Sequence, residues 1–306
     1  MILIVLLYSL FGFTFTIAKI SLQYASPFFI VASRMTLGGL GIMTYIYFSK
    51  KIRCYPAKTD RYLHAQLTLF GIFLPYCARA WALQYVTTSK AALLFNLAPF
   101  FVALYSYLLF KEKLTINKFI GLLLGFFGML PLLLSGTKLE DMVGMWGSFS
   151  FPEIALLISV ASFSYSMLIM QKLIKHRDCP PLLANGLSML TGGLMALFAS
   201  YFAEPQWIKG NGYTFIAILV FQVILSNIIC SQMQAHLLKK HSATLMSLAN
   251  FLTPLSAALF GWLIFGEKIT WHYFVSFILV SMGLYIYYYG SFFNRRKKQP
   301  PPIILE

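Results

Sequence analysis

The stretch PFFVALYSYLLFKEKLT, residues 99–115, returns as PLSAALFGWLIFGEKIT at residues 254–270. Further identities extend this match to Gly128 and Gly283, with an offset of about 155 positions. Both copies are apolar enough to lie within a lipid bilayer. A self-match at a nearly constant offset over this length indicates an internal duplication. The sequence therefore predicts a membrane protein made of two related halves.

The composition is that of a protein embedded in lipid. Apolar residues make up 59% of the 306 residues and charged residues only 11%, whereas a soluble protein is about one quarter charged. The basic residues behind the net charge of +15 lie in short gaps between apolar runs, as in cytoplasmic loops of membrane proteins. We therefore expect a lipid bilayer, and not a nucleic acid, as partner. The four cysteines form no Cys-x-x-Cys pair, so we expect neither a metal nor a cofactor.

Ten segments are long and apolar enough to span a bilayer, which requires roughly 20 residues. They cover residues 2–20, 28–48, 64–85, 89–110, 116–135, 153–172, 182–203, 213–234, 243–265 and 271–290. The first has no basic leader and no small-residue cleavage site, so we interpret it as a retained helix rather than a signal peptide. The sequence thus predicts an all-α polytopic membrane protein with ten transmembrane helices.

The distribution of lysine and arginine predicts the orientation of these helices. Seventeen of the 24 basic residues lie in the loops after helices 2, 4, 6 and 8 or in the C-terminal tail, and five lie on the opposite side. Because cytoplasmic loops carry the excess of positive charge, we expect both termini in the cytoplasm. The predicted location is the cytoplasmic (inner) membrane, which the chain crosses several times.

Each half of the duplication contains five predicted helices. An odd number of spans inserts the second copy upside down relative to the first, as in many secondary transporters. We place the first repeat at residues 1–137, the second at residues 153–290, and a basic, proline-rich cytoplasmic tail at residues 291–306. The match continues upstream, where MTLGGL at residues 35–40 corresponds to MLTGGL at residues 189–194.

Four stretches carry a family resemblance. They are FGFTFTIAK at residues 11–19, the step from Pro27 to Arg34, ALQYVTTS at residues 82–89, and the segment from Pro254 to GEK at residues 266–268. Together they resemble the drug/metabolite transporter superfamily, in particular its ten-helix EamA-like branch, although Phe11 stands where tryptophan is usual. The resemblance implies a secondary transporter that moves small organic molecules by alternating access. It also implies a central pathway lined by helices 1, 3, 4, 6, 8 and 9.

Basic residues at membrane depth are the first candidates for substrate binding. Arg79 lies deep in the third predicted helix, Arg34 in the second, and Lys19 near the end of the first. A cation in the middle of a bilayer costs on the order of 3 kcal/mol, so it needs a compensating partner. We predict that Arg79, together with Arg34 and Lys19, meets an anionic group of the substrate. The alternatives are that Lys19 extends to the membrane interface and that Arg34 binds helix-end carbonyls.

Polar and aromatic residues suggest the rest of the site. The candidates are Tyr76, Trp81, Asn96, Asn227, Gln234 and Asn250, with Pro99 and Pro254 as kink positions. Proline in a helix leaves a carbonyl without its backbone donor and creates a soft point beside a cavity. Tyr76 and Trp81 can stack on a flat or cationic substrate. The alternative for the amides is that they hold helices together by hydrogen bonds.

The absence of buried acids bears on mechanism and substrate. No aspartate or glutamate falls in the middle of a predicted helix, which favours exchange or facilitated transport over proton coupling. The intramembrane cations favour a small carboxylate-bearing substrate of amino-acid type. In the resembled family such substrates include S-adenosylmethionine and S-adenosylhomocysteine. The alternatives are an exporter of drugs or other hydrophobic or cationic metabolites and, in another class, a channel or a membrane enzyme.

An enzyme is the weaker of these alternatives. The sequence has no Walker loop, no His-Glu-x-x-His motif and no intramembrane acid, so we expect no catalytic residues. Gly121 and Gly125 form a Gly-x-x-x-Gly pair that allows close helix contact, either with a neighbouring helix or across a dimer seam. The sequence therefore leaves open a monomer or a homodimer.

Overall fold

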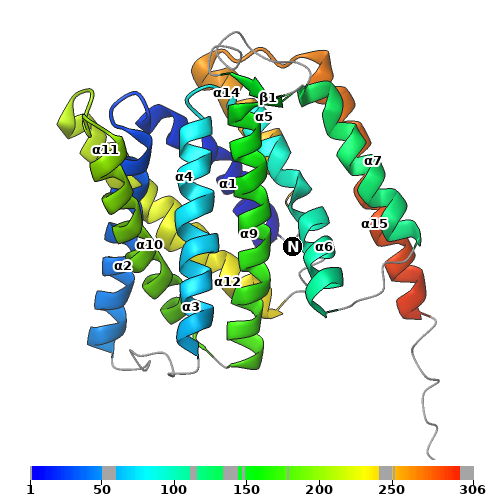
Figure 1. The fold of residues 1–306 in the computed structure, drawn as a ribbon, viewed down its shortest axis with the longest axis horizontal. Coiled ribbons are helices and arrows are strands. Elements are labelled where there is room, and N and C mark those ends of the chain that lie inside the picture. The colour runs from blue at the N-terminus through cyan, green and yellow to red at the C-terminus, as the bar shows by residue number, and fades with distance from the viewer. Residues whose placement is uncertain are drawn as a thin grey trace, which may run out of the picture.

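The computed structural model describes residues 2–49, 60–110, 116–133, 144–146, 149–177, 179–240, 250 and 252–296. Nearly all of this part is helical, as predicted. It also includes a short antiparallel strand pair, β1 (Met145–Trp146) and β2 (Phe149–Ser150). The helices run between two ends of a bundle, with the strands at its upper end (Figure 1).

In the described part of the first half, three helices are uninterrupted and two are interrupted. The uninterrupted helices are α1 (Ile2–Ser21), α2 (Pro27–Ser49) and α7 (Ile116–Leu133). One interrupted helix consists of α3 (Arg61–Leu67), the π-helical η2 (Thr68–Phe73) and α4 (Leu74–Ala82). The other consists of α5 (Thr88–Leu94), the 3-10 turn η3 (Phe95–Leu97) and α6 (Ala98–Phe110). The predicted helices 64–85 and 89–110 are therefore present but irregular.

The second half repeats part of this irregularity. Its elements are α9 (Phe151–His176), α10 (Pro181–Ala203), α11 (Gly212–Gln222), the π-helical η4 (Val223–Cys230), α12 (Ser231–Lys240), α14 (Leu252–Phe265) and α15 (Trp271–Arg296). η4 begins 155 positions after η2, so both halves carry a π-helical segment at matching positions of the repeat. The sequence placed the end of the last helix at residue 290, but α15 continues to Arg296. The remainder of the predicted tail, residues 297–306, and the start of the predicted helix 243–265 lie outside the described residues.

The helices have the length and surface of membrane spans. Five described helices are long and apolar enough to cross a membrane, and they cover Ile2–Ser21, Pro27–Ser49, Phe151–Ile174, Pro181–Ala203 and Gly212–Gln234. Shorter apolar helices cover Thr88–Val102, Leu252–Phe265 and Trp271–Gly283. Large side chains such as Phe198 and Phe202 are exposed, as expected where lipid covers the protein. The chain is a multi-pass membrane protein, and the count of ten spans stays a prediction.

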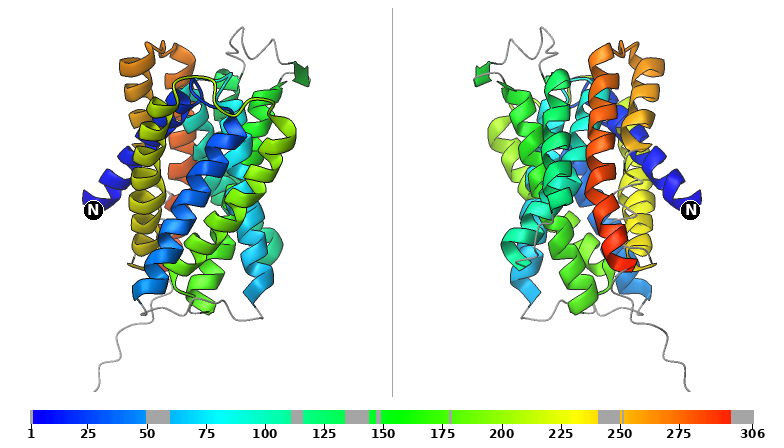
Figure 2. Two further views of the ribbon diagram at one scale, coloured as in Figure 1. Left: turned by 90° about the vertical axis from the view of Figure 1, so that its left-hand side faces the viewer. Right: turned by 90° about the vertical axis from the view of Figure 1, so that its right-hand side faces the viewer.

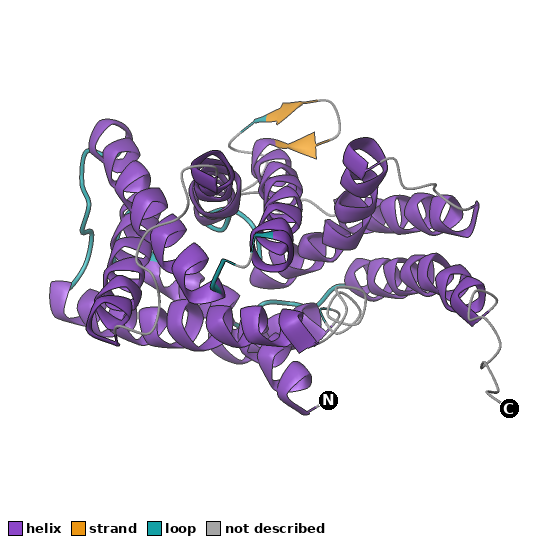
Figure 3. Cartoon of the chain, turned by 90° about the horizontal axis from the view of Figure 1, so that it is seen from below, coloured by secondary structure: helices purple, strands orange, loops and turns teal. Residues whose placement is uncertain are grey.

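Helices of the first half pack against helices of the second half. α2 packs against α10, and α7 packs against α15, so each contacts its counterpart in the repeat. α1 packs against α14 and η4, and α9 packs in the corresponding way against α6 and η2. α1 rises from the N-terminus to the upper end, whereas α9 descends from that end (Figures 1 and 2). The pair α7 and α15 stands at the right-hand edge, also when seen from below (Figure 3).

Glycine allows α2 and α10 to approach closely. A Cβ atom on Gly39 would lie 2.4 Å from the backbone nitrogen of Leu190, and one on Gly193 would lie 2.5 Å from the backbone nitrogen of Thr36. Backbone atoms within a helix cannot move aside easily, so only glycine fits at these two contacts. The repeated Gly-Gly pairs therefore mark the place where the two halves cross.

Gly39→Ala is expected to lower the free energy of unfolding by about 2 kcal/mol, because overpacking a tight contact typically costs this much. The matched control is Gly41→Ala, since a Cβ atom on Gly41 of the same helix meets nothing within 4 Å. Thermal unfolding of both variants in detergent measures the difference. Equal melting temperatures for the two variants would contradict the close crossing.

Two glycines of α7 are buried within a single chain. Gly121 and Gly128 are buried, and α7 packs against α15 of the same chain. This arrangement favours an intramolecular role for the Gly-x-x-x-Gly pair. The choice between a monomer and a homodimer stays a prediction.

Candidate functional site

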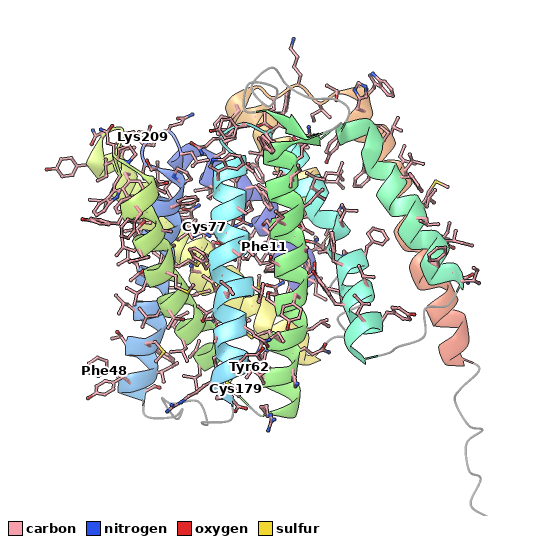
Figure 4. All side chains as sticks on the ribbon, in the orientation of Figure 1. Phe11, Phe48, Tyr62, Cys77, Cys179 and Lys209 are labelled. Carbon is pink, nitrogen blue, oxygen red and sulfur yellow. The ribbon has the colours of Figure 1, made fainter. Side chains whose placement is uncertain are left out.

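A cavity of about 830 Å³ lies between helices of both halves. Five of the predicted site residues line it, namely Tyr76, Arg79, Pro99, Gln234 and Asn250. Phe11 also lines it, and lies midway between the end marked by Lys209 and the end marked by Phe48 and Cys179 (Figure 4). The cavity therefore lies at middle depth in the bundle.

Arg79 on α4 is held by aromatic rings. Its guanidinium carbon lies 4.6 Å from the ring centre of Tyr76, 5.0 Å from that of Phe15 and 5.5 Å from that of Phe95. Such cation–π contacts contribute about 0.5–2 kcal/mol each. Among the described residues, no ion pair includes Arg79. The charge thus lines the cavity without an ion-pair partner among the described residues.

Arg34 on α2 contacts the same tyrosine from outside the cavity lining. Its guanidinium carbon lies 5.0 Å from the ring centre of Tyr76. The residue is only 3% exposed, and its Nε finds no hydrogen-bond partner in the part of the chain that the structure describes. Arg34 therefore holds the ring that in turn contacts Arg79.

Lys19, unlike Arg79, has an anionic partner among the described residues. Its Nζ donates to Oε1 of Glu267 at 3.0 Å and to the carbonyl oxygen of Val86 at 2.9 Å. Glu267, in the turn between α14 and α15, also accepts from the backbone nitrogen and Oγ1 of Thr88, at 3.0 and 2.7 Å. Burial alone would raise the pKa of Glu267, but the charge of Lys19 and the Thr88 hydrogen bonds hold this pKa below its usual value. Lys19 lies outside the cavity lining.

Asn96 and Asn250 meet across the two halves. Nδ2 of Asn250 donates to Oδ1 of Asn96 at 3.4 Å, and Oδ1 of Asn250 accepts from Oγ1 of Thr253 at 3.0 Å. Asn96 is 1% exposed, so of this pair only Asn250 lines the cavity. Asn96 belongs to the 3-10 turn η3, which ends two residues before Pro99. The helix changes its geometry beside the residue where the sequence predicts a kink.

Three further predicted residues, in addition to Arg34, Lys19 and Asn96, lie outside the cavity lining. Pro254 lies in the first turn of α14, where its carbonyl oxygen accepts from the hydroxyl of Tyr273 at 2.8 Å. Asn227 is buried in η4, with its amide against a methionine sulfur. Trp81 packs edge-on against Tyr85, with ring centres 5.4 Å apart. In the structure these three residues contact other residues of the protein rather than the cavity.

Phe15 and Phe95 were missed as site residues. Tyr76 and Trp81 were the only aromatic residues predicted for the site, but Phe15 and Phe95 are only 5% and 9% exposed and also contact Arg79. Two signals could have identified them. Phe15 lies one turn before Lys19 on the same face of α1. Phe95 is the repeat counterpart of Asn250, at an offset of 155 positions.

A second ion pair is more deeply buried. Nζ of Lys90 lies 2.5 Å from Oε1 of Glu153, and their side chains are 4% and 2% exposed. Glu153 also forms a capping box with Ser150 at the start of α9, where a carboxylate complements the positive end of the helix. Lys90 and Lys19 are therefore each paired with a glutamate, whereas Arg79 forms no ion pair with a described residue.

Comparison with known proteins shows that the chain is similar to transporters. The profile of the EamA-like transporter family matches residues 1–134 and residues 150–289. A crystal structure that is 17% identical superposes with a TM-score of 0.65 over 97% of both chains, so the two share a fold.

Three curated relatives are similar along most of the chain. The S-adenosylmethionine/S-adenosylhomocysteine transporter of Chlamydia muridarum (strain MoPn / Nigg) is 32% identical over 262 residues, which cover 83% of this chain and 80% of the relative. The protein of the same name from Chlamydia trachomatis serovar L2 is 30% identical, with coverage of 83% and 78%. The uncharacterized transporter YoaV of Bacillus subtilis (strain 168) is 24% identical, with coverage of 90% and 92%.

Proposed function

Because this chain belongs to the EamA-like transporter family, we propose that it carries a small carboxylate-bearing metabolite across the cytoplasmic membrane by alternating access. The proposed substrate is of the S-adenosylmethionine or S-adenosylhomocysteine type, an amino acid joined to a nucleoside. The names of relatives at 32% and 30% identity support this choice. The proposed binding residues are Arg79, Tyr76, Gln234 and Asn250.

The charge of Arg79 is the observation that carries the proposal. At middle depth in a membrane protein, an uncompensated cation costs on the order of 3 kcal/mol or more. The aromatic cage offsets part of this cost, and no ion pair between described residues neutralises the guanidinium. A substrate carboxylate would supply the missing anion through charge-assisted hydrogen bonds, which are roughly twice as strong as neutral ones.

The lining of the cavity suits the proposed substrate. Its aromatic walls and amide groups match a ligand with both apolar and hydrogen-bonding parts. Arg34 is assigned a supporting role, since it contacts Tyr76. Lys19 is assigned the role of holding Glu267.

Two inverted five-helix halves are the proposed moving parts. The opposite directions of α1 and α9, the helix contacts between the two halves and the matching π-helical segments support this arrangement. α2, α9 and α15 end at the lower side of Figure 1, which we assign to the cytoplasm together with both termini. No acidic side chain lines the cavity among the described residues, which supports exchange or facilitated transport rather than proton coupling.

Counterflow in proteoliposomes tests this function. Vesicles loaded with unlabelled S-adenosylhomocysteine should accumulate labelled S-adenosylmethionine from outside, and the initial rate should saturate with concentration. Vesicles without protein, and protein-containing vesicles loaded with a lipophilic cation, are the controls. Accumulation driven by the lipophilic cation but not by S-adenosylhomocysteine would contradict the proposal and favour a drug exporter.

A further inference from the structure

A second cavity of about 630 Å³ adjoins the first. The two cavities share five lining residues: Tyr76, Phe163, Met167, Ser231 and Gln234. The first cavity extends from these shared residues to Arg79 and the helices α1 and α14, whereas the second extends to η2 and α10. The binding space therefore has two compartments that meet at Tyr76 and Gln234.

The second compartment differs from the first in charge. No lysine, arginine, histidine, aspartate or glutamate lines it among the described residues. Its polar groups are amides and hydroxyls, chiefly those of Asn185, Ser188, Ser166 and Gln234. A compartment without charges favours an uncharged part of a ligand, because a buried charge needs a partner.

One hydrogen-bonding side chain of this compartment, Asn185, is available to a ligand. Its amide makes no hydrogen bond that involves the described residues, and the residue is partly exposed. The hydroxyls of Ser188 and Ser166 donate to carbonyl oxygens of their own helices at 2.7 Å, and these residues are only 1% and 4% exposed. An amide presents a donor and an acceptor side by side, the pattern that pairs with the edge of an adenine base.

The apolar walls suit a flat ring. Three methionines, Met167, Met170 and Met189, line the second compartment. Methionine sulfur is polarizable and makes favourable contacts with aromatic rings. The ring of Tyr76 stands at the junction, where contacts with Arg34 and Arg79 at 5.0 and 4.6 Å fix its position.

From this geometry we infer that the second compartment binds the uncharged nucleoside part of the substrate, with Asn185 hydrogen-bonded to the base. This inference rests on the proposed function, in which Arg79 binds the carboxylate of the same molecule. The ligand then spans both compartments and passes between Tyr76 and Gln234. Asn185 determines specificity, because it distinguishes a nucleoside conjugate from a free amino acid.

Binding measured by isothermal titration of detergent-purified protein tests the division of the site. The probes are S-adenosylhomocysteine, methionine and adenosine. Asn185→Ala should weaken the binding of S-adenosylhomocysteine and of adenosine about tenfold, which is the effect of one lost hydrogen bond in a buried site. The affinity for methionine should change by no more than about twofold. Arg79→Ala should weaken the binding of methionine and of S-adenosylhomocysteine, whereas the affinity for adenosine should change by no more than about twofold. Asn117→Ala on α7, which lines neither cavity, is the matched control and should change none of the three.

The outcomes separate this inference from the proposed function. If Asn185→Ala weakens all three probes equally, or weakens none, the nucleoside compartment is wrong, even when Arg79→Ala behaves as expected. If the wild-type protein binds neither adenosine nor S-adenosylhomocysteine, the compartment is likewise wrong. If Arg79→Ala leaves methionine and S-adenosylhomocysteine unaffected, the proposed function fails. In that case, the change in adenosine affinity caused by Asn185→Ala is the remaining test of the nucleoside compartment.

Discussion

Arg79→Ala is expected to lower the counterflow of S-adenosylmethionine by at least about 100-fold, while the protein still reaches the membrane. Truncating one partner of a buried charge pair costs about 2–5 kcal/mol, and each 1.4 kcal/mol corresponds to a factor of ten. Arg79→Lys should retain part of the activity, because lysine keeps the charge but lacks the planar, two-pronged donor geometry. The measurement is the initial counterflow rate, normalised to the amount of reconstituted protein.

Arg177→Ala is the matched control for Arg79→Ala. The Arg177 side chain is 48% exposed and pairs with Asp60 at 3.5 Å, away from the cavity. Asp60 is largely buried, with a side chain 9% exposed, but the pair lines neither cavity, so the transport rate per amount of reconstituted protein should stay close to that of the wild type. Full activity of Arg79→Ala would remove Arg79 from the substrate site and with it the basis of the proposed function.

Glu267→Gln is expected to destabilise the protein by about 2 kcal/mol. The Glu267 carboxylate joins the end of α1, the first turn of α5 and the turn after α14 through Lys19 and Thr88. Breaking a fully buried ion pair costs about 3–5 kcal/mol. The expected effect is smaller because the Lys19 side chain is 23% exposed. Thermal unfolding in detergent measures it, and Lys268→Gln, an exposed charge change at the next position, is the control.

The contribution of Glu267 should also depend on pH in a defined direction. Because the folded-state pKa of Glu267 lies below the usual value of 4.5, its stabilising effect is fully present above pH 4.5. This effect is lost as the pH falls through the folded-state pKa. The difference in melting temperature between the wild type and Glu267→Gln should therefore be constant near neutral pH and shrink in acid. A difference that grows as the pH falls would contradict the assignment.

The main helices could be predicted from sequence because each is a long apolar run. Their interruptions could not. The π-helical segment η2 has the sequence TLFGIF, which contains no proline and differs in no obvious way from a regular membrane helix. η2 and η3 each end two residues before a proline, Pro75 and Pro99, but only Pro99 was predicted as a kink position. No proline lies in or beside η4, so proline marks some of the interruptions and not others.

The candidate site was only partly visible for a related reason. Arg79 and Tyr76 stand three positions apart, so they share a helix face, and the structure places both on the cavity. Trp81 is two positions from Arg79 and faces elsewhere, since residues two apart lie on opposite sides of a helix. The partner of Lys19 could not be found by such spacing. Glu267 is 248 positions away and reaches Lys19 only when the two halves pack together.

The most direct test of the central claim compares S-adenosylmethionine with its decarboxylated form in the same counterflow assay. If Arg79 binds the substrate carboxylate, the wild-type protein should prefer S-adenosylmethionine by about 100-fold in affinity, as expected for one buried charge pair. Arg79→Ala should then show no preference between the two. Equal affinities in the wild-type protein, or an undiminished preference in Arg79→Ala, would contradict the claim.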